Sequence, residues 1–127
     1  MTPLETWHAY IKSQDHGALL DMLHPDVVFE SPVVHTPQRG RAITYKYLAS
    51  ADKVLGGPGF TYVGEWTSAD GAILEFENVI NGIKVNGIDM IRWDADGRII
   101  HFKVMVRPLK AIQMVHAMMG EMLARAG

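Results

Sequence analysis

The residue best placed to act as an acid is Asp89, because the sequence puts this carboxylate among apolar side chains. The runs Ala72 to Ile80 and Ile83 to Trp93 alternate with a period of two, which predicts paired strands. Asn81-Gly82 between them is typical of a two-residue hairpin turn, which requires positive φ at both central residues. Pairing across that turn predicts one shared face, made of Leu74, Phe76, Asn78, Val85, Asp89, Ile91 and Trp93.

An aspartate on such a face has two interpretations. If it is buried, desolvation raises its pKa or a hydrogen-bond donor meets it. If it lies at the end of a strand, it is hydrated or bonded to backbone instead. The first interpretation makes Asp89 a candidate acid within a pocket.

The elements that position this hairpin follow from the periodicity on either side of it. Thr2, Pro3 and Glu5 form a capping-box pattern that starts a helix. Asp15 is placed to cap a short second helix, and His24-Pro25 ends it. Further elements are expected at Val27 to Phe29 (strand), Arg41 to Leu55 (helix), Phe60 to Thr67 and Ile99 to Arg107 (strands), and after Pro108 (helix). Helices segregated against an antiparallel sheet predict an α+β domain spanning 1–127.

Composition excludes several classes of function. The net charge is −2 and no Lys/Arg run occurs, so we expect no nucleic-acid partner. The absence of cysteine excludes a thiolate nucleophile and a Cys-type zinc site, and the six histidines lack metal-ligand spacing. No dinucleotide fingerprint or membrane-spanning run occurs. We therefore expect no metal, no cofactor, no membrane partner and a cytoplasmic location.

Two stretches carry a resemblance to a known family. Residues 88–100, and residues 26–33 together with Pro37 and Gly40, resemble ketosteroid isomerases and related SnoaL-like proteins of the nuclear-transport-factor-2-like (NTF2-like) superfamily. The resemblance implies a cone-shaped, cystatin-like α+β fold, in which helices pack over an apolar pocket beside a strongly bent antiparallel sheet. It also implies that Asp89 holds the position of the oxyanion-hole aspartic acid, which donates a hydrogen bond to a developing enolate.

The same resemblance places unexpected residues at the other catalytic positions. The general-base aspartate falls on Ser31, the oxyanion tyrosine on Trp7 and a supporting tyrosine on Leu48. Serine cannot transfer a proton near neutral pH without an activating base, so steroid isomerisation by the usual groups is not expected. Gly87 replaces the arginine that the epoxide-hydrolase branch requires. His35 could take over as base, or it could be an exposed loop histidine.

The predicted pocket would hold a small apolar or amphipathic ligand. We expect Asp89 to share it with Trp7, Phe29, Leu48, Phe76, Asn78, Ile91, Phe102, Val104 and Val106. Two functions remain open. One is a cofactor-independent isomerase or cyclase of a hydrophobic carbonyl compound that uses Asp89 as acid or oxyanion donor. The other is a non-catalytic module for apolar-ligand binding or dimerisation.

The opposite face of the hairpin also indicates an assembly. Ile73, Val79, Ile88, Met90, His101 and Met105 lie among charges on that face, which is too apolar to be left wholly hydrated. Members of the resembled family pair through it, so a homodimer is expected.

Overall fold

The structure is a computed structural model that describes residues 1–126. Its four helices are α1 (Pro3–Ser13), α2 (His16–Met22), α3 (Arg41–Leu55) and α4 (Leu109–Ala126). Its strands are β1 (Leu23–Glu30), β2 (Gln38–Arg39), β3 (Thr61–Ser68), β4 (Gly71–Ile80), β5 (Ile83–Trp93) and β6 (Ile99–Arg107). The α+β class and the predicted order of helices and strands are therefore confirmed, with β2 as a short addition.

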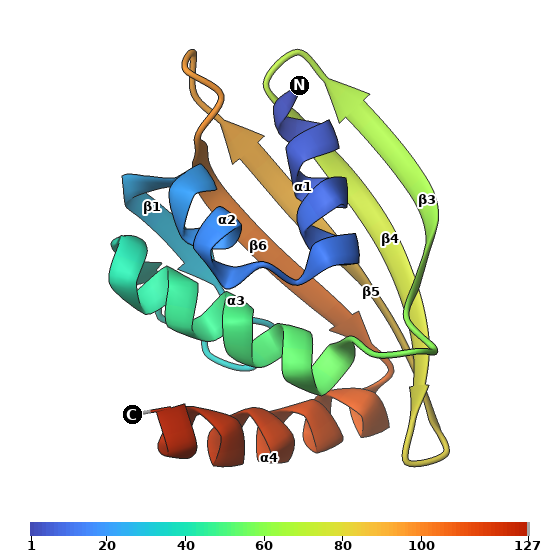
Figure 1. The fold of residues 1–127 in the computed structure, drawn as a ribbon. Coiled ribbons are helices and arrows are strands. Elements are labelled where there is room, and N and C mark those ends of the chain that lie inside the picture. Colours follow the sequence, from blue (N-terminus) through green and yellow to red (C-terminus); the bar gives the residue numbers. More distant parts are fainter. Residues whose placement is uncertain (127) are drawn as a thin grey trace.

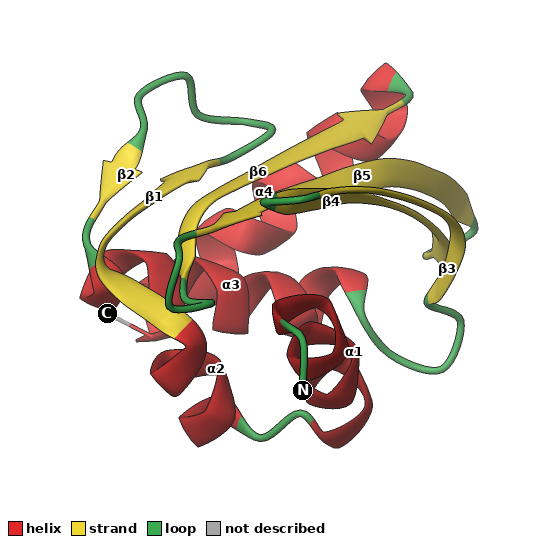
Figure 2. Ribbon diagram, turned by 90° about the horizontal axis from the view of Figure 1, so that it is seen from above, coloured by secondary structure: helices red, strands yellow, loops and turns green. Residues whose placement is uncertain are grey.

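The sheet is mixed rather than purely antiparallel. Its strand order is β2-β1-β6-β5-β4-β3, and every neighbouring pair is antiparallel except β1 and β6, which run parallel. The parallel pair arises because the chain leaves β1, forms α3 and the meander, and only then returns to the edge of β1. The sheet curves strongly, and α1, α2 and α3 lie on its concave side (Figure 1, Figure 2).

The central hairpin has the register that the sequence predicts. Asn81 and Gly82 have φ of 52° and 76°, as a tight turn with two left-handed residues requires. Ile80 faces Ile83, and Asp89 faces Leu74 on β4. On its other side Asp89 faces Val104 of β6. Asp89 is thereby fixed on the inner, concave face of the sheet.

Helix caps fix where α1 and α2 begin, and both helices lie over that face (Figure 2). Thr2 and Glu5 form the predicted capping box, and Asp15 caps α2 through the backbone N–H groups of Gly17 and Ala18. Trp7 and Tyr10 are the buried side chains of α1, and Leu48 is buried on α3. The core thus lies between the helices and the concave face, and the cavity described below interrupts it. Among residues 1–126, no helix is long and apolar enough to cross a membrane.

Candidate functional site

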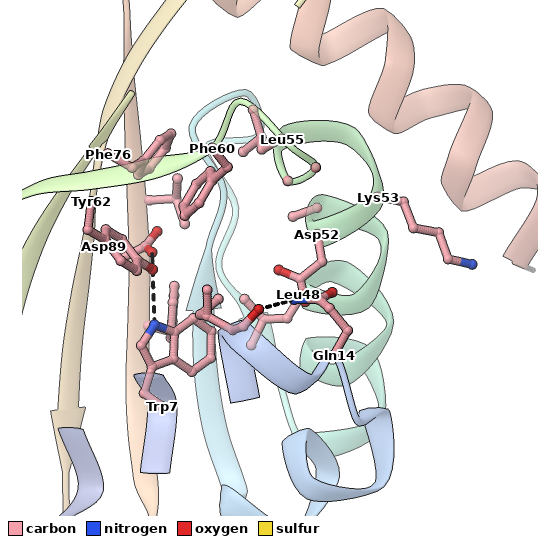
Figure 3. Close-up of a pocket in the computed structure, with 16 residues that line it drawn as sticks. Trp7, Gln14, Leu48, Asp52, Lys53, Leu55, Phe60, Tyr62, Phe76 and Asp89 are labelled. Atoms are coloured by element: carbon pink, nitrogen blue, oxygen red, sulfur yellow. Dashed lines mark hydrogen bonds between the residues drawn. The ribbon is translucent and has the colours of Figure 1, made fainter. Parts of the chain in front are cut away.

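A cavity of about 590 Å³ lies between the concave face of the sheet and helices α1 and α3. Six of the ten side chains expected to share a pocket line it, namely Trp7, Leu48, Phe76, Asp89, Phe102 and Val104. The remaining lining residues are Ile11, Gln14, Ala51, Asp52, Lys53, Leu55, Gly56, Gly57, Phe60 and Tyr62. The wall is mainly apolar, with Asp89 on its strand side and Asp52 on its helix side (Figure 3).

Four of the residues expected in the pocket lie outside the lining of this cavity. Phe29 and Ile91 lie on the same inner face but are fully packed into the core. Asn78 donates from Nδ2 to the carbonyl oxygen of Leu55 at 2.7 Å, and so ties β4 to the end of α3. Val106 lies near the end of β6 and lines a different hollow. Alternation places a residue on the right face, but the cavity occupies only the middle of that face.

The two candidate bases from the proline-rich loop do not meet Asp89. Ser31 and His35 line a separate hollow of about 310 Å³, together with Val106. The Ser31 hydroxyl accepts a hydrogen bond from the backbone N–H of Val33 at 3.1 Å. The loop therefore places both residues apart from the cavity that contains the buried carboxylate.

Asp89 ends a chain of hydrogen bonds that starts at Trp7. The Trp7 indole N–H donates to the Tyr62 hydroxyl at 3.0 Å, and that hydroxyl donates to Asp89 Oδ2 at 2.6 Å. The indole N–H is thus used within the protein and does not point into the cavity as a free donor. Its effect is to orient the Tyr62 hydroxyl, which in turn fixes the carboxyl group of Asp89 (Figure 3).

Burial dominates the ionisation of Asp89. Its side chain is 8% exposed, and this desolvation raises the pKa of Asp89 to about 7. The hydrogen bond from Tyr62 opposes the rise because it stabilises the anion, whereas the negative charge of Asp52 adds to it. The carboxyl group is therefore held near the midpoint of its titration at neutral pH, which suits a group that donates and recovers a proton.

Asp52 is a second carboxylate of the same cavity, and it was not among the residues predicted to lie there. It lies on α3, where it accepts a hydrogen bond from the Tyr10 hydroxyl through Oδ2. Burial raises the pKa of Asp52 to about 6, and the bond from Tyr10 partly opposes that rise. Burial and the neighbouring carboxylate also raise the pKa of Tyr10. The cavity thus contains two tyrosine–aspartate pairs, one on each side.

Both missed residues, Asp52 and Tyr62, had a signal in the sequence. Asp52 follows Leu48 by four positions and precedes Leu55 by three, so it lies on the apolar stripe of its helix. Tyr62 pairs with Phe76 across β3 and β4, and therefore shares the inner face. That pairing could not be fixed from the sequence, because Ser68-Ala69-Asp70-Gly71 lacks the Asn-Gly signature of a two-residue turn and the register shifts between Tyr62 and Gly64.

Gly87 leaves room for the ring that forms part of the cavity wall. A Cβ at this position would lie 2.5 Å from both Phe76 Cζ and the carbonyl oxygen of Met105. Phe76 also stacks on Phe60, with ring centroids 5.3 Å apart. A side chain at position 87 would therefore force Phe76 or the backbone of β6 to shift.

The arrangement can supply acid–base chemistry to an apolar guest. Its ionisable lining groups are Asp52, Lys53, Tyr62 and Asp89, and Figure 3 shows the Lys53 ammonium directed away from the cavity. Among residues 1–126, no three His, Asp or Glu side chains gather as a set of metal ligands. The two aspartates are thus the groups in the lining whose pKa lies near neutrality.

Comparisons with known proteins agree with this fold. A family model described as "SnoaL-like domain" matches residues 4–102. No curated protein matches the chain. A steroid delta-isomerase from Pseudomonas aeruginosa is 38% identical, with a TM-score of 0.91; the match covers 98% of this chain and 90% of that one.

Two more distant structures show the fold alone. A protein with a cystatin-like fold from Silicibacter pomeroyi is 22% identical, with a TM-score of 0.85 over 94% of this chain and 83% of that one. A SnoaL-like polyketide cyclase, described as putative, from Jannaschia is 10% identical, with a TM-score of 0.69 over 91% of this chain and 92% of that one. The NTF2-like cone is therefore the fold of this chain.

Proposed function

The chain belongs to the SnoaL-like domain family, and we propose that it is an isomerase or cyclase that acts on a hydrophobic carbonyl compound. The observation that carries the proposal is Asp89, a buried carboxyl group that faces an apolar cavity from the middle of the sheet. The cavity volume lies within the range of small-molecule sites. An apolar wall with a single proton donor on the strand side suits a hydrophobic guest with one carbonyl oxygen.

In the proposed reaction Asp89 acts in its protonated form. The Tyr62 hydroxyl uses Oδ2, so the proton on Oδ1 is available to the carbonyl oxygen of the substrate. As negative charge develops on that oxygen, the hydrogen bond from Asp89 strengthens and stabilises the enolate. Tyr62 also shares the negative charge if Asp89 transfers its proton completely.

Similarity to solved structures supports this class of reaction. The steroid delta-isomerase from Pseudomonas aeruginosa matches nearly the whole chain at 38% identity, which makes a hydrophobic ketone the first substrate class to test. The SnoaL-like cyclase shares the fold only, so ring closure of a carbonyl compound is the second.

The test follows the conversion of 5-androstene-3,17-dione to its conjugated isomer by ultraviolet absorbance. We expect turnover by the unaltered protein and a loss of about 100-fold or more in Asp89→Asn, as for removal of one oxyanion donor. Asp96→Asn, in the exposed turn after β5, is the matched control and should keep full activity. Activity that survives in Asp89→Asn would refute the role of Asp89. Tight binding of the steroid without turnover would favour the ligand-binding module.

We further propose that the outer face of the sheet pairs two copies of the chain. Trp66 is 58% exposed and Met105 is 45% exposed on this side. Both are large apolar side chains, and an isologous contact would bury them. Light scattering at micromolar concentration should give twice the mass of the chain, and Met105→Lys should lower it. A monomeric mass for the unaltered protein would contradict this assembly.

A further inference from the structure

We propose that Asp52 is the catalytic base that works with Asp89, taking the proton from the carbon next to the substrate's carbonyl group. The inference rests on the proposed function and names the proton acceptor that the Ser31 position does not supply. The two carboxyl groups line one cavity from opposite sides, Asp89 from β5 and Asp52 from α3 (Figure 3). A guest between them would meet a hydrogen-bond donor on one side and a proton acceptor on the other.

The geometry leaves one oxygen of Asp52 for the substrate. Among the described residues, Tyr10 is the one that hydrogen bonds to this carboxyl group, and it uses Oδ2. Oδ1 is therefore the atom that would accept a proton from the guest. Tyr10 is itself buried on α1, and its hydroxyl holds Asp52 in place much as Tyr62 holds Asp89. A positioned carboxylate in an apolar cavity is a stronger base than one in water.

Other candidate bases are less well placed. Ser31 and His35 line the separate hollow near the end of β6. Glu30 bonds to His101 on the outer face of the sheet, so it cannot reach the guest. Lys53 lines the rim, but its ammonium group turns away from the cavity in Figure 3. Asp52 is thus the carboxylate best placed in this lining to work with Asp89.

The surroundings of Asp52 also divide the two roles between the aspartates. The polar groups that face Asp52 are Tyr10 of α1, Asp89 of β5 and Tyr62 of β3. Lys53 is next to it in sequence, and the β6 side of the cavity is apolar, with Phe102 and Val104. The pKa of Asp52 is raised to about 6 and that of Asp89 to about 7. Asp89 is buried whereas Asp52 is only half-buried, so the proton is held more tightly on Asp89. This order suits Asp52 to accept a proton while Asp89 donates a hydrogen bond.

The step balances without any further reactant. Asp52 Oδ1 takes the proton from the α carbon, and the electrons of that C–H bond form a new C=C bond. The electrons of the carbonyl π bond move to its oxygen, which Asp89 stabilises by its hydrogen bond. In an isomerase Asp52 then returns the proton to the γ carbon, and the C=O bond re-forms with the double bond in conjugation.

The experiment compares Asp52→Asn, Asp52→Glu and the exposed control Asp21→Asn by three measurements. These are isomerisation of 5-androstene-3,17-dione, exchange of its α protons with deuterium oxide by NMR, and binding of the phenol 2-naphthol by fluorescence. We expect Asp52→Asn to lose about 100-fold or more in isomerisation and exchange, with a 2-naphthol Kd changed by less than about threefold. Asp52→Glu should recover part of the rate, and Asp21→Asn all of it.

A further variant, Tyr10→Phe, tests whether Asp52 acts as the base or has only a structural role. It removes the donor that stabilises the Asp52 anion, so the rising limb of the pH–rate profile should move to higher pH while the falling limb stays. Unchanged isomerisation and exchange in Asp52→Asn, with loss in Asp89→Asn, would overturn this assignment and leave the proposed function standing. Absence of both reactions in the unaltered protein would overturn the two together.

Discussion

On the outer face of the sheet, Glu30 of β1 meets two basic side chains of β6, whereas on the inner face Asp89 of β5 meets a tyrosine. His101 Nε2 lies 2.7 Å from Glu30 Oε2, and Lys103 Nζ lies 3.5 Å from the same oxygen. The hydrogen bond from His101, with the charge of Lys103, lowers the pKa of Glu30. Desolvation instead raises the pKa of Asp89 to about 7.

The difference shows that the sheet position alone does not set the chemistry of a carboxyl group. Glu30 is adjacent to Lys103 across the parallel β1–β6 pair, where side chains remain in contact with solvent. Asp89 is flanked by Leu74 and Val104 on its own face, and helices cover it. A neutral donor and an apolar wall keep the proton on the inner carboxyl group near neutral pH, whereas basic partners remove it from the outer one.

The largest expected effect is on stability at alkaline pH, in Asp89→Asn. A folded-state pKa raised to about 7 means that the folded chain holds the proton more tightly than the unfolded chain, whose value is ~3.9. The resulting stability is fully present below pH ~3.9 and is lost as pH rises to about 7. Asn cannot ionise, so at pH 8 the variant should gain up to about 4 kcal/mol in unfolding free energy over the unaltered protein, the linkage value of a pKa raised from ~3.9 to about 7.

Urea unfolding at pH 4 and pH 8 measures this gain. Glu30→Gln is the matched control from the outer face and should give no gain at pH 8, because the lowered pKa of Glu30 means that its anion is already favoured in the folded state. If both variants changed the unfolding free energy at pH 8 by the same amount, burial on the inner face would not distinguish Asp89 from Glu30, and the prediction would be contradicted.

A smaller effect is expected from Tyr62→Phe, which breaks the chain from Trp7 to Asp89. The variant leaves the indole N–H without its acceptor and removes the donor to Asp89 Oδ2. At pH 5 we expect a loss of about 1 to 3 kcal/mol in unfolding free energy, the usual cost of an unsatisfied buried group. The pKa of Asp89 should rise further, since this hydrogen bond lowers it. Urea unfolding measures the loss of stability, and NMR titration measures the pKa of Asp89. A lower pKa of Asp89 in the variant would contradict the hydrogen bond from Tyr62.

The smallest effect is expected on the outer face, in His101→Gln. Removing the main partner of Glu30 should move the pKa of Glu30 up toward its ordinary value, as measured by carbon-13 NMR. Sodium chloride at high concentration should do the same in the unaltered protein, because exposed ion pairs are screened. The pKa of Asp89 should not respond to either change. A parallel shift at Asp89 would mean that the inner face is open to solvent.

Most of the fold could be predicted from the sequence because its signals are local. The capping box at Thr2 and Glu5 and the Asn81-Gly82 turn each fix a boundary within a few residues. The parallel pairing of β1 with β6 could not be predicted, since it joins segments some 70 residues apart and depends on how α3 packs. Local sequence patterns determine where helices and strands begin and end, whereas long-range packing determines which strands pair.

The candidate site was only partly predictable for the same reason. Asp89 follows from a two-residue turn that fixes the register of its whole hairpin. Tyr62 lies beside a shift in the β3–β4 register between Tyr62 and Gly64, which interrupts simple alternation. Asp52 lies on the apolar stripe of α3, but its charge favours assignment to the surface, although it lines the cavity. Buried polar groups are those for which the hydrophobic pattern is a poor guide.

The central claim is that the cavity holds a carboxyl group whose proton is retained to near neutrality, and carbon-13 NMR titration of aspartate-labelled protein tests it most directly. Asp89→Asn and Asp52→Asn assign the two side-chain signals by their disappearance. We expect an Asp89 midpoint near pH 7, with Asp52 titrating near pH 6. A midpoint for Asp89 at or below the ordinary ~3.9 would show a hydrated or ion-paired carboxylate and would contradict its role as a hydrogen-bond donor.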